Sequence, residues 1–185
     1  MGWIRQNWTF FSILVLVVSA GWIAFNPPAT GSTTGGHIPA PAEGFLAPDF
    51  ELQQANGQSI RLSSLRGRPV LLNLWASWCA PCKAEMPAMQ RVYEAYAPRG
   101  FAILAVNTTF QDDRTNAIAF AESLGLTFPL LFDMDGTVSR QYRVSAMPTS
   151  FFIDSEGIIR RVVYGGPISE ALLRAEIEQM LAEVR

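Results

Sequence analysis

Residues 70–86 read VLLNLWASWCAPCKAEM, and within this stretch the pattern changes from that of a buried strand to that of a helix. Val70 to Ala76 form a near-continuous apolar run, which is typical of a central strand covered on both faces. After this run, side chains that suit a buried helix face recur at helical spacing, with Pro87 as an expected kink: Cys82, Met86, Met89, Tyr93 and Tyr96. The two cysteines therefore stand where a buried strand gives way to an amphipathic helix.

The segments on either side of this stretch alternate between strand and helix patterns. Two short strands are expected between Phe50 and Leu62, because Asn56-Gly57 is a strong hairpin signal. Further strands are predicted at 101–106, 129–132, 149–154 and 158–164, and further helices around 117–124 and 173–184. This order predicts an α/β fold with a mixed central sheet, flanked by helices and preceded by a β-hairpin extension.

Length, charge and composition exclude several classes of protein. The 185 residues allow one globular domain and an appendage, but not separate cofactor and substrate domains. A net charge of −2 argues against nucleic-acid binding, and two cysteines cannot form a multi-bridge scaffold. Apolar residues make up 49% and charged residues 16%, so disorder is excluded and one part of the chain must be unusually apolar.

The N-terminal segment supplies this apolarity, since it has no charged residue between Gln6 and Ala42. Residues 8–25 would form a helix of about 27 Å, close to the thickness of a membrane's hydrocarbon core. Because Arg5 lies on the short side, the positive-inside bias places residues 1–7 in the cytoplasm and the remainder on the extracytoplasmic face. We expect a single-pass cell-membrane protein; the alternative is a cleavable signal peptide ending near Val18-Ser19-Ala20, and both export the domain.

Residues 26–44 are predicted to be a flexible linker, because they are rich in Pro, Gly, Ser and Thr and have no periodicity. Residues 45–185 are expected to form the domain. His37, the chain's one histidine, falls in the linker, where a solvated side chain is expected rather than a metal ligand.

Cys79-Ala80-Pro81-Cys82 carries the chemistry that we expect of this chain. A thiolate at a helix N-terminus meets unpaired amide groups and the positive end of the helix dipole, which lower the thiol pKa. Cys79 would then be the nucleophile, and Cys82 would resolve the mixed disulfide that Cys79 forms. Pro81 suits the first turn because it needs no amide donor.

Three other uses of the two cysteines are weighed against redox exchange. A structural disulfide enclosing two residues would remove little entropy from the unfolded chain. A structural zinc site needs four ligands, and the predicted domain offers two cysteines and no histidine. A copper(I) carrier could use both thiolates and a nearby Met, since soft ligands suit that ion.

The segment from Trp78 to Pro87 resembles the W-C-x-P-C-x-x-E-x-P signature of membrane-anchored thioredoxin-like thiol-disulfide oxidoreductases. These form the TlpA-like family, which includes reductases of cytochrome c maturation of the ResA and CcmG type. Ala146-Met147-Pro148-Thr149 is similar to the family's cis-proline loop, and the resemblance covers residues 45–185. It implies the thioredoxin fold, a cis Pro148, and pairing of the Met147 backbone with a substrate strand.

One position departs from thioredoxin itself, where a buried Asp lies beneath the active site. The matching residue here is Asn73, as in many TlpA-like members, and an amide cannot accept the proton that Cys82 must lose. Glu85 is the nearest acid in the sequence and is a candidate proton acceptor. The alternatives are that solvent takes the proton and that Glu85 is an exposed carboxylate paired with cations.

We therefore expect a protein-disulfide reductase that acts on exported proteins such as apocytochrome c and is reduced again by a membrane electron-donor thiol oxidoreductase. Trp78 is expected to border the substrate surface, together with Met147 and Pro148. No cofactor, metal or nucleic acid is expected, and the chain is expected to act as a monomer. The alternative functions are a copper(I) delivery module and a redoxin-type peroxidase, although Cys79 lacks the P-x-x-x-T-x-x-C context of a peroxidatic cysteine.

Two acidic clusters are expected to serve the fold. Asp112-Asp113 should begin a helix by capping it and complementing its dipole. Asp133-Met134-Asp135-Gly136 is similar to the start of a calcium loop but lacks the later ligands, so a turn is expected.

Overall fold

The computed structural model describes residue 15 and residues 38–183. The chain divides into two units, Met1–Thr33 and Thr34–Arg185, and in the first of them only Val15, which is helical, is described. The predicted span 8–25, apart from Val15, and the predicted linker up to residue 37 lie outside the described residues. No helix in the described part is both long and apolar enough to cross a membrane.

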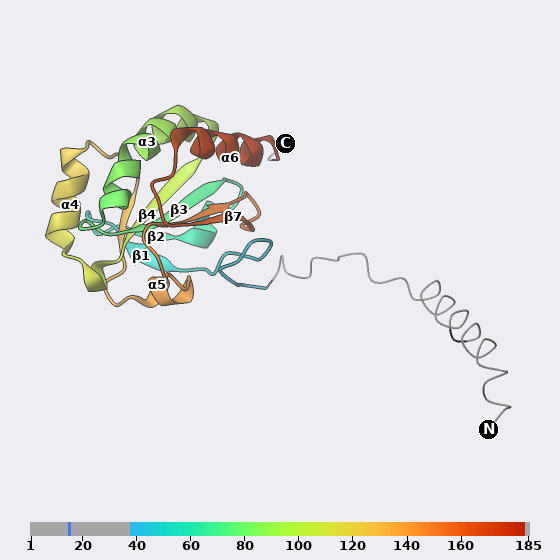
Figure 1. Cartoon of the computed structure of the whole chain (residues 1–185), viewed down its shortest axis with the longest axis horizontal. Coiled ribbons are helices and arrows are strands. Elements are labelled where there is room, and N and C mark those ends of the chain that lie inside the picture. The colour runs from blue at the N-terminus through green and yellow to red at the C-terminus, as the bar shows by residue number, and fades with distance from the viewer. Residues whose placement is uncertain (1–14, 16–37, 184–185) are drawn as a thin grey trace, which may run out of the picture. The chain divides into compact units, whose positions relative to one another are not determined.

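Five strands form the central sheet in the order β5-β4-β3-β6-β7 (Figure 1). β4 is parallel to β3 and β5, whereas β6 is antiparallel to β3 and β7, so the sheet is mixed as predicted. The apolar run becomes the middle strand. The strands are β3 (Val70–Trp75), β4 (Ala102–Asn107), β5 (Leu130–Phe132), β6 (Thr149–Ile153) and β7 (Ile159–Tyr164).

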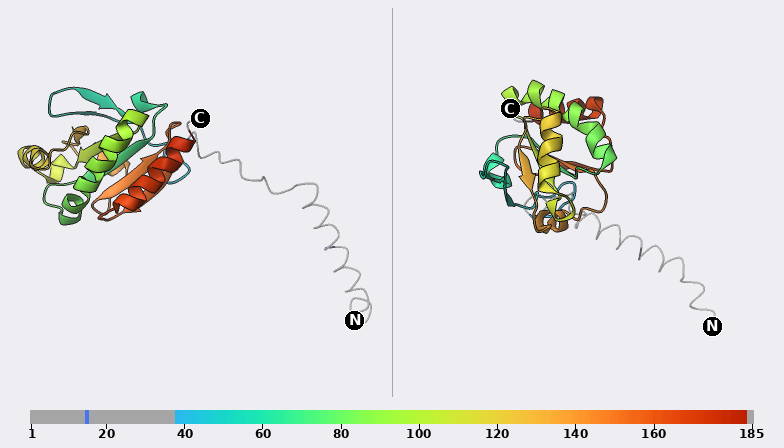
Figure 2. Two further views of the ribbon diagram at one scale, coloured as in Figure 1. Left: turned by 90° about the horizontal axis from the view of Figure 1, so that it is seen from above. Right: turned by 90° about the vertical axis from the view of Figure 1, so that its left-hand side faces the viewer.

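Helices cover both faces of this sheet. They are α3 (Ala80–Tyr96), α4 (Arg114–Ser123), α5 (Thr137–Gln141) and α6 (Glu170–Ala182). α3 and α6 pack against each other over one face, and Figure 2 shows them running side by side. α5 lies on the opposite side, where Figure 1 also shows β1 (Glu51–Gln53) and β2 (Ser59–Arg61). These two strands pair antiparallel, which confirms the hairpin predicted around Asn56-Gly57.

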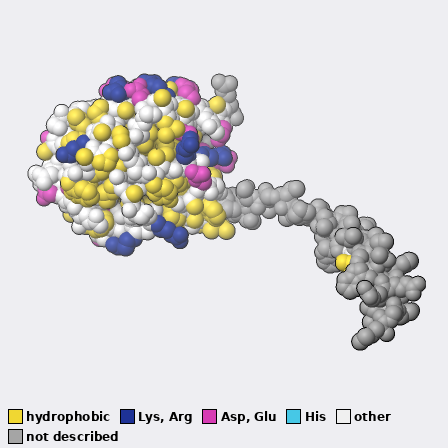
Figure 3. Space-filling model, viewed as in Figure 1, with side chains coloured by type: hydrophobic (Ala, Val, Ile, Leu, Met, Phe, Trp, Pro, Cys, Tyr) yellow, Lys and Arg dark blue, Asp and Glu magenta, His cyan; other side chains and the backbone are white. Residues whose placement is uncertain are grey.

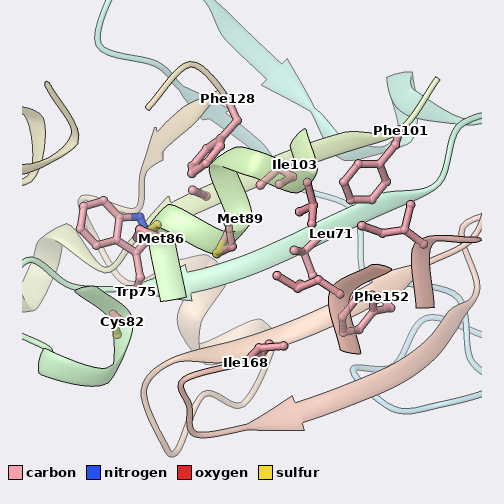
Figure 4. Packing of buried hydrophobic residues seen from close by; sticks show 14 of the residues in the cluster. Leu71, Trp75, Cys82, Met86, Met89, Phe101, Ile103, Phe128, Phe152 and Ile168 are labelled. Carbon is pink, nitrogen blue, oxygen red and sulfur yellow. The ribbon is translucent and has the colours of Figure 1, made fainter. Parts of the chain in front are cut away.

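The core consists of two clusters, one on each face of the sheet, and β3 contributes side chains to both because successive side chains of a strand point to opposite faces. Leu71 and Trp75 belong to a cluster with buried residues of α3, α4 and α6. Leu72 and Leu74 belong to the second cluster, together with buried residues of α5 and partly buried residues of the β1–β2 hairpin. Figure 4 shows part of the first cluster, including Cys82, which is carried by α3. α3 is therefore held against the sheet by the larger of the two clusters.

The N-terminal end of the domain differs from the predicted linker. Residues 43–47 run along β7: Gly44 N–H donates to the carbonyl of Ile159 (2.8 Å), and Ile159 N–H donates to that of Phe45 (2.9 Å). The Glu43 carboxylate accepts from the amide of Val162 (2.9 Å). Residues 38–44, which the composition assigns to the linker, thus include several that are bonded to the domain.

α5 is a helix that the sequence pattern does not predict. Its five residues are too few to show a 3.6-residue period. The buried Asp133 carboxylate organises it by accepting from the amides of Val138 (3.2 Å) and Ser139 (2.8 Å) and from the Ser139 hydroxyl (2.6 Å). The acidic cluster at 133–136 therefore forms a turn, as predicted, and a helix begins directly after it.

On the face of the molecule drawn in Figure 3, hydrophobic side chains gather over the middle of the domain, and charged side chains lie mostly towards its outline. Half of the ion pairs in the described part join two exposed side chains, such as Arg99 with Glu178. Exposed pairs of this kind contribute little to stability, so the two apolar clusters carry most of it.

Candidate active site

The two cysteines meet at the junction of β3 and α3. Cys79 is the N-cap of α3, and its Sγ accepts from the amide of Cys82 (3.3 Å), while Pro81 lies in the first turn. The pair forms a disulfide with an S–S distance of 2.06 Å. Cys79 retains 4% of its accessible surface and Cys82 retains none. An incoming partner can therefore reach Cys79 but not Cys82.

A groove of about 510 Å³ opens beside Cys79. Three segments far apart in the sequence form its walls: the cysteine turn, a 3₁₀ turn at Thr109–Gln111, and α5 together with the loop that leads from it to β6. The residues that line it are all uncharged: Trp78, Cys79, Ala80, Pro81, Phe110, Gln111, Ser139, Val144, Ser145, Ala146 and Met147. A neutral lining of this kind suits an uncharged segment of a binding partner.

The loop with Met147 has the conformation that the family resemblance implies. The Met147–Pro148 peptide bond is cis, and Met147 lines the groove. Neither the amide nor the carbonyl of Met147 is bonded to another described residue. Thr108 Oγ1 approaches its sulfur at 3.8 Å. The main chain of Met147 is thus free to pair with another chain.

The two tryptophans near the cysteines occupy different environments. Trp75 is fully buried in the first cluster, whereas Trp78 is 58% exposed and lines the groove. The Trp78 indole N–H donates to the carbonyl of Gln111 (3.0 Å), which fixes the ring against the neighbouring wall.

Glu85 is buried, so the interpretation as an exposed carboxylate paired with cations is wrong. Its side chain follows Cys82 by three residues on the same face of α3, and the residue keeps 1% of its accessible surface. Asn73 Nδ2 donates to one carboxylate oxygen (2.8 Å), and the amide of Ile168 donates to the other (3.0 Å). Burial raises the pKa of Glu85 to about 7, although these two hydrogen bonds oppose the rise.

Asn73 joins Glu85 to β6. Its Nδ2 also donates to Ser150 Oγ (2.8 Å), while its Oδ1 has no partner among the described residues. The Asn73 amide therefore provides a donor to the buried acid but takes no proton from it.

The segment after β7 closes over Glu85. A Cβ atom at Gly166 would lie 2.9 Å from a Glu85 oxygen and 2.6 Å from Pro148 Cγ, so this close approach requires glycine. The Gly166–Pro167 peptide bond is also cis. Sequence reasoning missed this segment, although Gly165-Gly166-Pro167 was the available signal.

A second carboxylate lies at the other side of the cysteine turn. Asp112 accepts from the amide (2.5 Å) and the hydroxyl (2.6 Å) of Ser77, and from Asn107 Nδ2 (2.7 Å). Partial burial works to raise the pKa of Asp112, but these hydrogen bonds and one from the Asp113 amide outweigh it and lower that pKa. The expectation that both aspartates begin the helix is therefore wrong for Asp112: only Asp113 caps α4, by accepting from Asn116 N–H (2.9 Å).

Comparison with known proteins places this geometry in a family. Residues 44–162 match the model of the AhpC/TSA family. The chain belongs to that family. Thiol-disulfide oxidoreductase ResA of Geobacillus kaustophilus is 36% identical over 173 residues, which are 94% of this chain and 92% of that protein. ResA of Bacillus subtilis is 37% identical over 153 residues, covering 83% of this chain and 81% of that protein.

A solved structure shows the same fold. A crystal structure described as a thiol:disulfide interchange protein DsbE from Chlorobium tepidum superposes with a TM-score of 0.69 at 33% identity, covering 78% of this chain and 99% of that one. The domain thus has the thioredoxin-like fold that the resemblance implied. Together with the sequence relatives, this likeness makes the chain a thiol-disulfide oxidoreductase of the ResA/DsbE type.

Burial of Glu85 predicts how stability depends on pH. Between about pH 4.5 and 7 the folded chain keeps the proton of Glu85 while the unfolded chain loses it, so stability falls as pH rises through this window. The loss is on the order of 3 kcal/mol. Glu85→Gln should remove this loss, because an amide does not ionise, so the stability of the variant should not fall between pH 4.5 and 8. The variant should be less stable than wild type at pH 4.5, because its NH₂ group cannot accept one of the two hydrogen bonds that the carboxyl group accepts.

Urea unfolding of the oxidised protein at a series of pH values measures this difference. Glu156→Gln, which removes an exposed carboxyl, is the matched control and should keep the wild-type dependence. A Glu85→Gln variant that loses as much stability as wild type between pH 4.5 and 8 would contradict the assignment of the raised pKa.

Proposed function

We propose that the domain reduces disulfides of other proteins. The reduced Cys79 thiolate attacks one sulfur of a substrate disulfide, forms a mixed disulfide, and expels the other substrate sulfur as a thiolate. The Cys82 thiolate then attacks Cys79 Sγ, which releases the second substrate thiolate and leaves the Cys79–Cys82 disulfide. Two electrons pass to the substrate, and a membrane electron-donor dithiol protein restores the pair.

The observation that carries this proposal is the unequal access to the two sulfurs. Cys79 borders the groove, and Cys82 is enclosed by the core. A protein substrate therefore meets Cys79 first, and Cys82 can react only with the sulfur of Cys79. This order of events is what a nucleophile and a resolving thiol require.

The groove is an argument for a protein substrate rather than a small molecule. An extended segment of the substrate could pair with the free amide and carbonyl of Met147 beside the cis Pro148. The exposed Trp78 ring would cover the part of the segment next to its cysteine. Both groups lie on the groove that Cys79 borders, so pairing there would bring the substrate disulfide to the nucleophile.

Glu85 supports the second step in this proposal. Cys82 must lose its proton before it can attack, and it lies one turn from Glu85 on the same face of α3. With a pKa of about 7, the carboxylate is half ionised at neutral pH, so it can accept a proton there and give it up again. Asn73 and Ile168 hold both of its oxygens in place.

Exported proteins with cysteine pairs, apocytochrome c among them, are the proposed substrates. This proposal rests on the apolar segment 8–25, which is expected to place the domain outside the cytoplasm, and on the family resemblance.

Trapping tests the substrate class. Cys82→Ser in the full chain should arrest the mixed disulfide on Cys79, because no second thiol remains to resolve it. Captured proteins, identified by mass spectrometry after non-reducing electrophoresis, should be exported proteins that contain cysteine pairs. Cys79→Ser is the control and should capture none. Capture of cytoplasmic proteins alone would contradict the proposed substrates.

The redox potential tests the direction of electron flow. A reductase should have a midpoint potential near −270 mV, as thioredoxin does, whereas a value near −120 mV is that of an oxidant and would overturn the proposal. Equilibration with dithiothreitol buffers can be followed through tryptophan fluorescence, since Trp78 adjoins Cys79. Cys79→Ser should show no transition over the same range.

The rate of resolution tests the role of Glu85. Glu85→Gln should slow the release of substrate from the mixed disulfide at pH 7 by about 100-fold, the lower end of what a positioned proton acceptor contributes. It should also abolish the inflection near pH 7 in the rate profile, which stopped-flow fluorescence can record. Glu156→Gln should leave both unchanged. A wild-type profile in Glu85→Gln would show that solvent takes the proton.

A further inference from the structure

The turn between β3 and Cys79 is held by a neighbouring carboxylate rather than by its own backbone alone. Ser77 and Trp78 form this turn, and within it Cys79 N–H donates to the carbonyl of Ala76 (3.2 Å). The other anchor is Asp112, which accepts from both the amide and the hydroxyl of Ser77. The position of Cys79 thus depends on a residue that follows it by more than thirty positions.

Asp112 is itself fixed from the sheet. Asn107 at the end of β4 is fully buried, pairs in register with Trp75, and donates through Nδ2 to Asp112. The Asn107 Oδ1 accepts from Thr109 Oγ1 (2.9 Å), which fixes the orientation of the amide. With the amide of Asp113 (2.8 Å), Asp112 has four donors. None of the ion pairs in the described part includes it.

The same residue joins two walls of the groove. Asp112 directly follows the 3₁₀ turn that supplies Phe110 and Gln111 to one wall, and it holds the turn that supplies Trp78 to the other. The hydrogen bond from the Trp78 indole to the Gln111 carbonyl closes the contact between the walls. Moving Asp112 would therefore move the nucleophile and the substrate surface together.

We propose that Asp112 is a positioning residue for thiol-disulfide exchange with protein substrates, because it sets Cys79 and the Trp78–Gln111 side of the groove in one geometry. The inference rests on the proposed binding of a protein segment in that groove. Misplacing a reacting group by about 1 Å can slow a reaction by about 100-fold, so a modest shift of the turn is sufficient for a measurable effect.

Asp113 provides the matched control for Asp112. It is the adjacent aspartate, it is exposed, and it caps α4 instead of bonding to the cysteine turn. Asp113→Asn and Asp112→Asn therefore remove the same charge from neighbouring positions. Only Asp112→Asn takes an acceptor away from Ser77, because one of the two carboxylate oxygens becomes an NH₂ donor.

Two disulfides separate positioning from general loss of structure. The first is a short uncharged peptide whose single cysteine is joined to 2-mercaptoethanol; attack by Cys79 on the peptide sulfur forms the mixed disulfide and expels 2-mercaptoethanol thiolate. The second is bis(2-hydroxyethyl) disulfide, which has no segment to place in the groove. Both react in single-turnover experiments with the reduced full chain in detergent.

Asp112→Asn should slow the reaction with the peptide about tenfold and that with the small disulfide less than twofold, whereas Asp113→Asn should change each less than twofold. Ser77→Ala removes one of the two Ser77 donors and should give a smaller loss that is not additive with Asp112→Asn. If Asp112→Asn does not fold, Ser77→Ala alone must still slow the peptide reaction selectively.

The positioning role would be overturned if Asp112→Asn slowed the reactions with both disulfides equally, or if neither Asp112→Asn nor Ser77→Ala slowed the reaction with the peptide. The proposed function fails separately: it would be contradicted if the wild-type protein itself reacted no faster with the peptide than with the small disulfide. Trp78 indole proton exchange, measured by NMR, gives an independent readout and should accelerate in Asp112→Asn but not in Asp113→Asn.

Discussion

Glu85 accepts one hydrogen bond from Asn73 and another from the amide of Ile168, in a part of the core that water does not reach. A buried carboxyl group without such partners is strongly destabilising. The segment that carries Glu85 must therefore meet the two segments that carry its hydrogen-bond donors. β3 brings Asn73, α3 brings Glu85, and the chain after β7 brings Ile168. This convergence fixes the rotation of α3 against the sheet, and hence the place of Cys82 one turn earlier.

Two carboxyl groups thus flank the cysteine pair, and their surroundings give them different properties. Glu85 lies beneath the pair, where burial dominates and raises its pKa to about 7. Asp112 lies beside the turn, where hydrogen bonds dominate and lower its pKa. Near neutral pH the first can exchange a proton while the second stays charged. One domain therefore obtains a proton-exchanging group and a fixed anionic anchor from the same functional group.

The sequence predicted those elements whose signals are local. The apolar run from Val70, the helical spacing after Cys82 and the Asn56-Gly57 turn each act over a few residues, and the structure confirms the corresponding strand, helix and hairpin. The short α5 gave no periodicity. It depends on the buried Asp133, whose role becomes visible only when its partners are placed.

The site was predicted less completely because much of it is built from contacts between distant residues. The spacing of Cys79 and Cys82, together with the family resemblance, indicated thiol-disulfide exchange without any tertiary information. The burial of Glu85 depends on Ile168, which lies 83 positions further along the chain. Asp112 holds the cysteine turn through Ser77, which lies 35 positions earlier, so the sequence around Asp112 indicated only the start of a helix. Local patterns and the family resemblance thus named Cys79, Trp78 and Glu85, but not the burial of that carboxyl group or the contacts that hold the cysteine turn.

The bonding of residues 43–47 to β7 has a consequence for association with other chains. A sheet ends in rows of unpaired amides and carbonyls, which can recruit a strand from another molecule. Here Gly44, Phe45 and Ala47 occupy the outer side of β7 and the loop before it, and at the opposite end Gln54 bridges to Leu131 of β5. Both borders of the sheet are thus partly capped by the chain's own N-terminal residues. Strand addition at either border is disfavoured, which protects the domain from aggregation and leaves the groove beside Cys79 open.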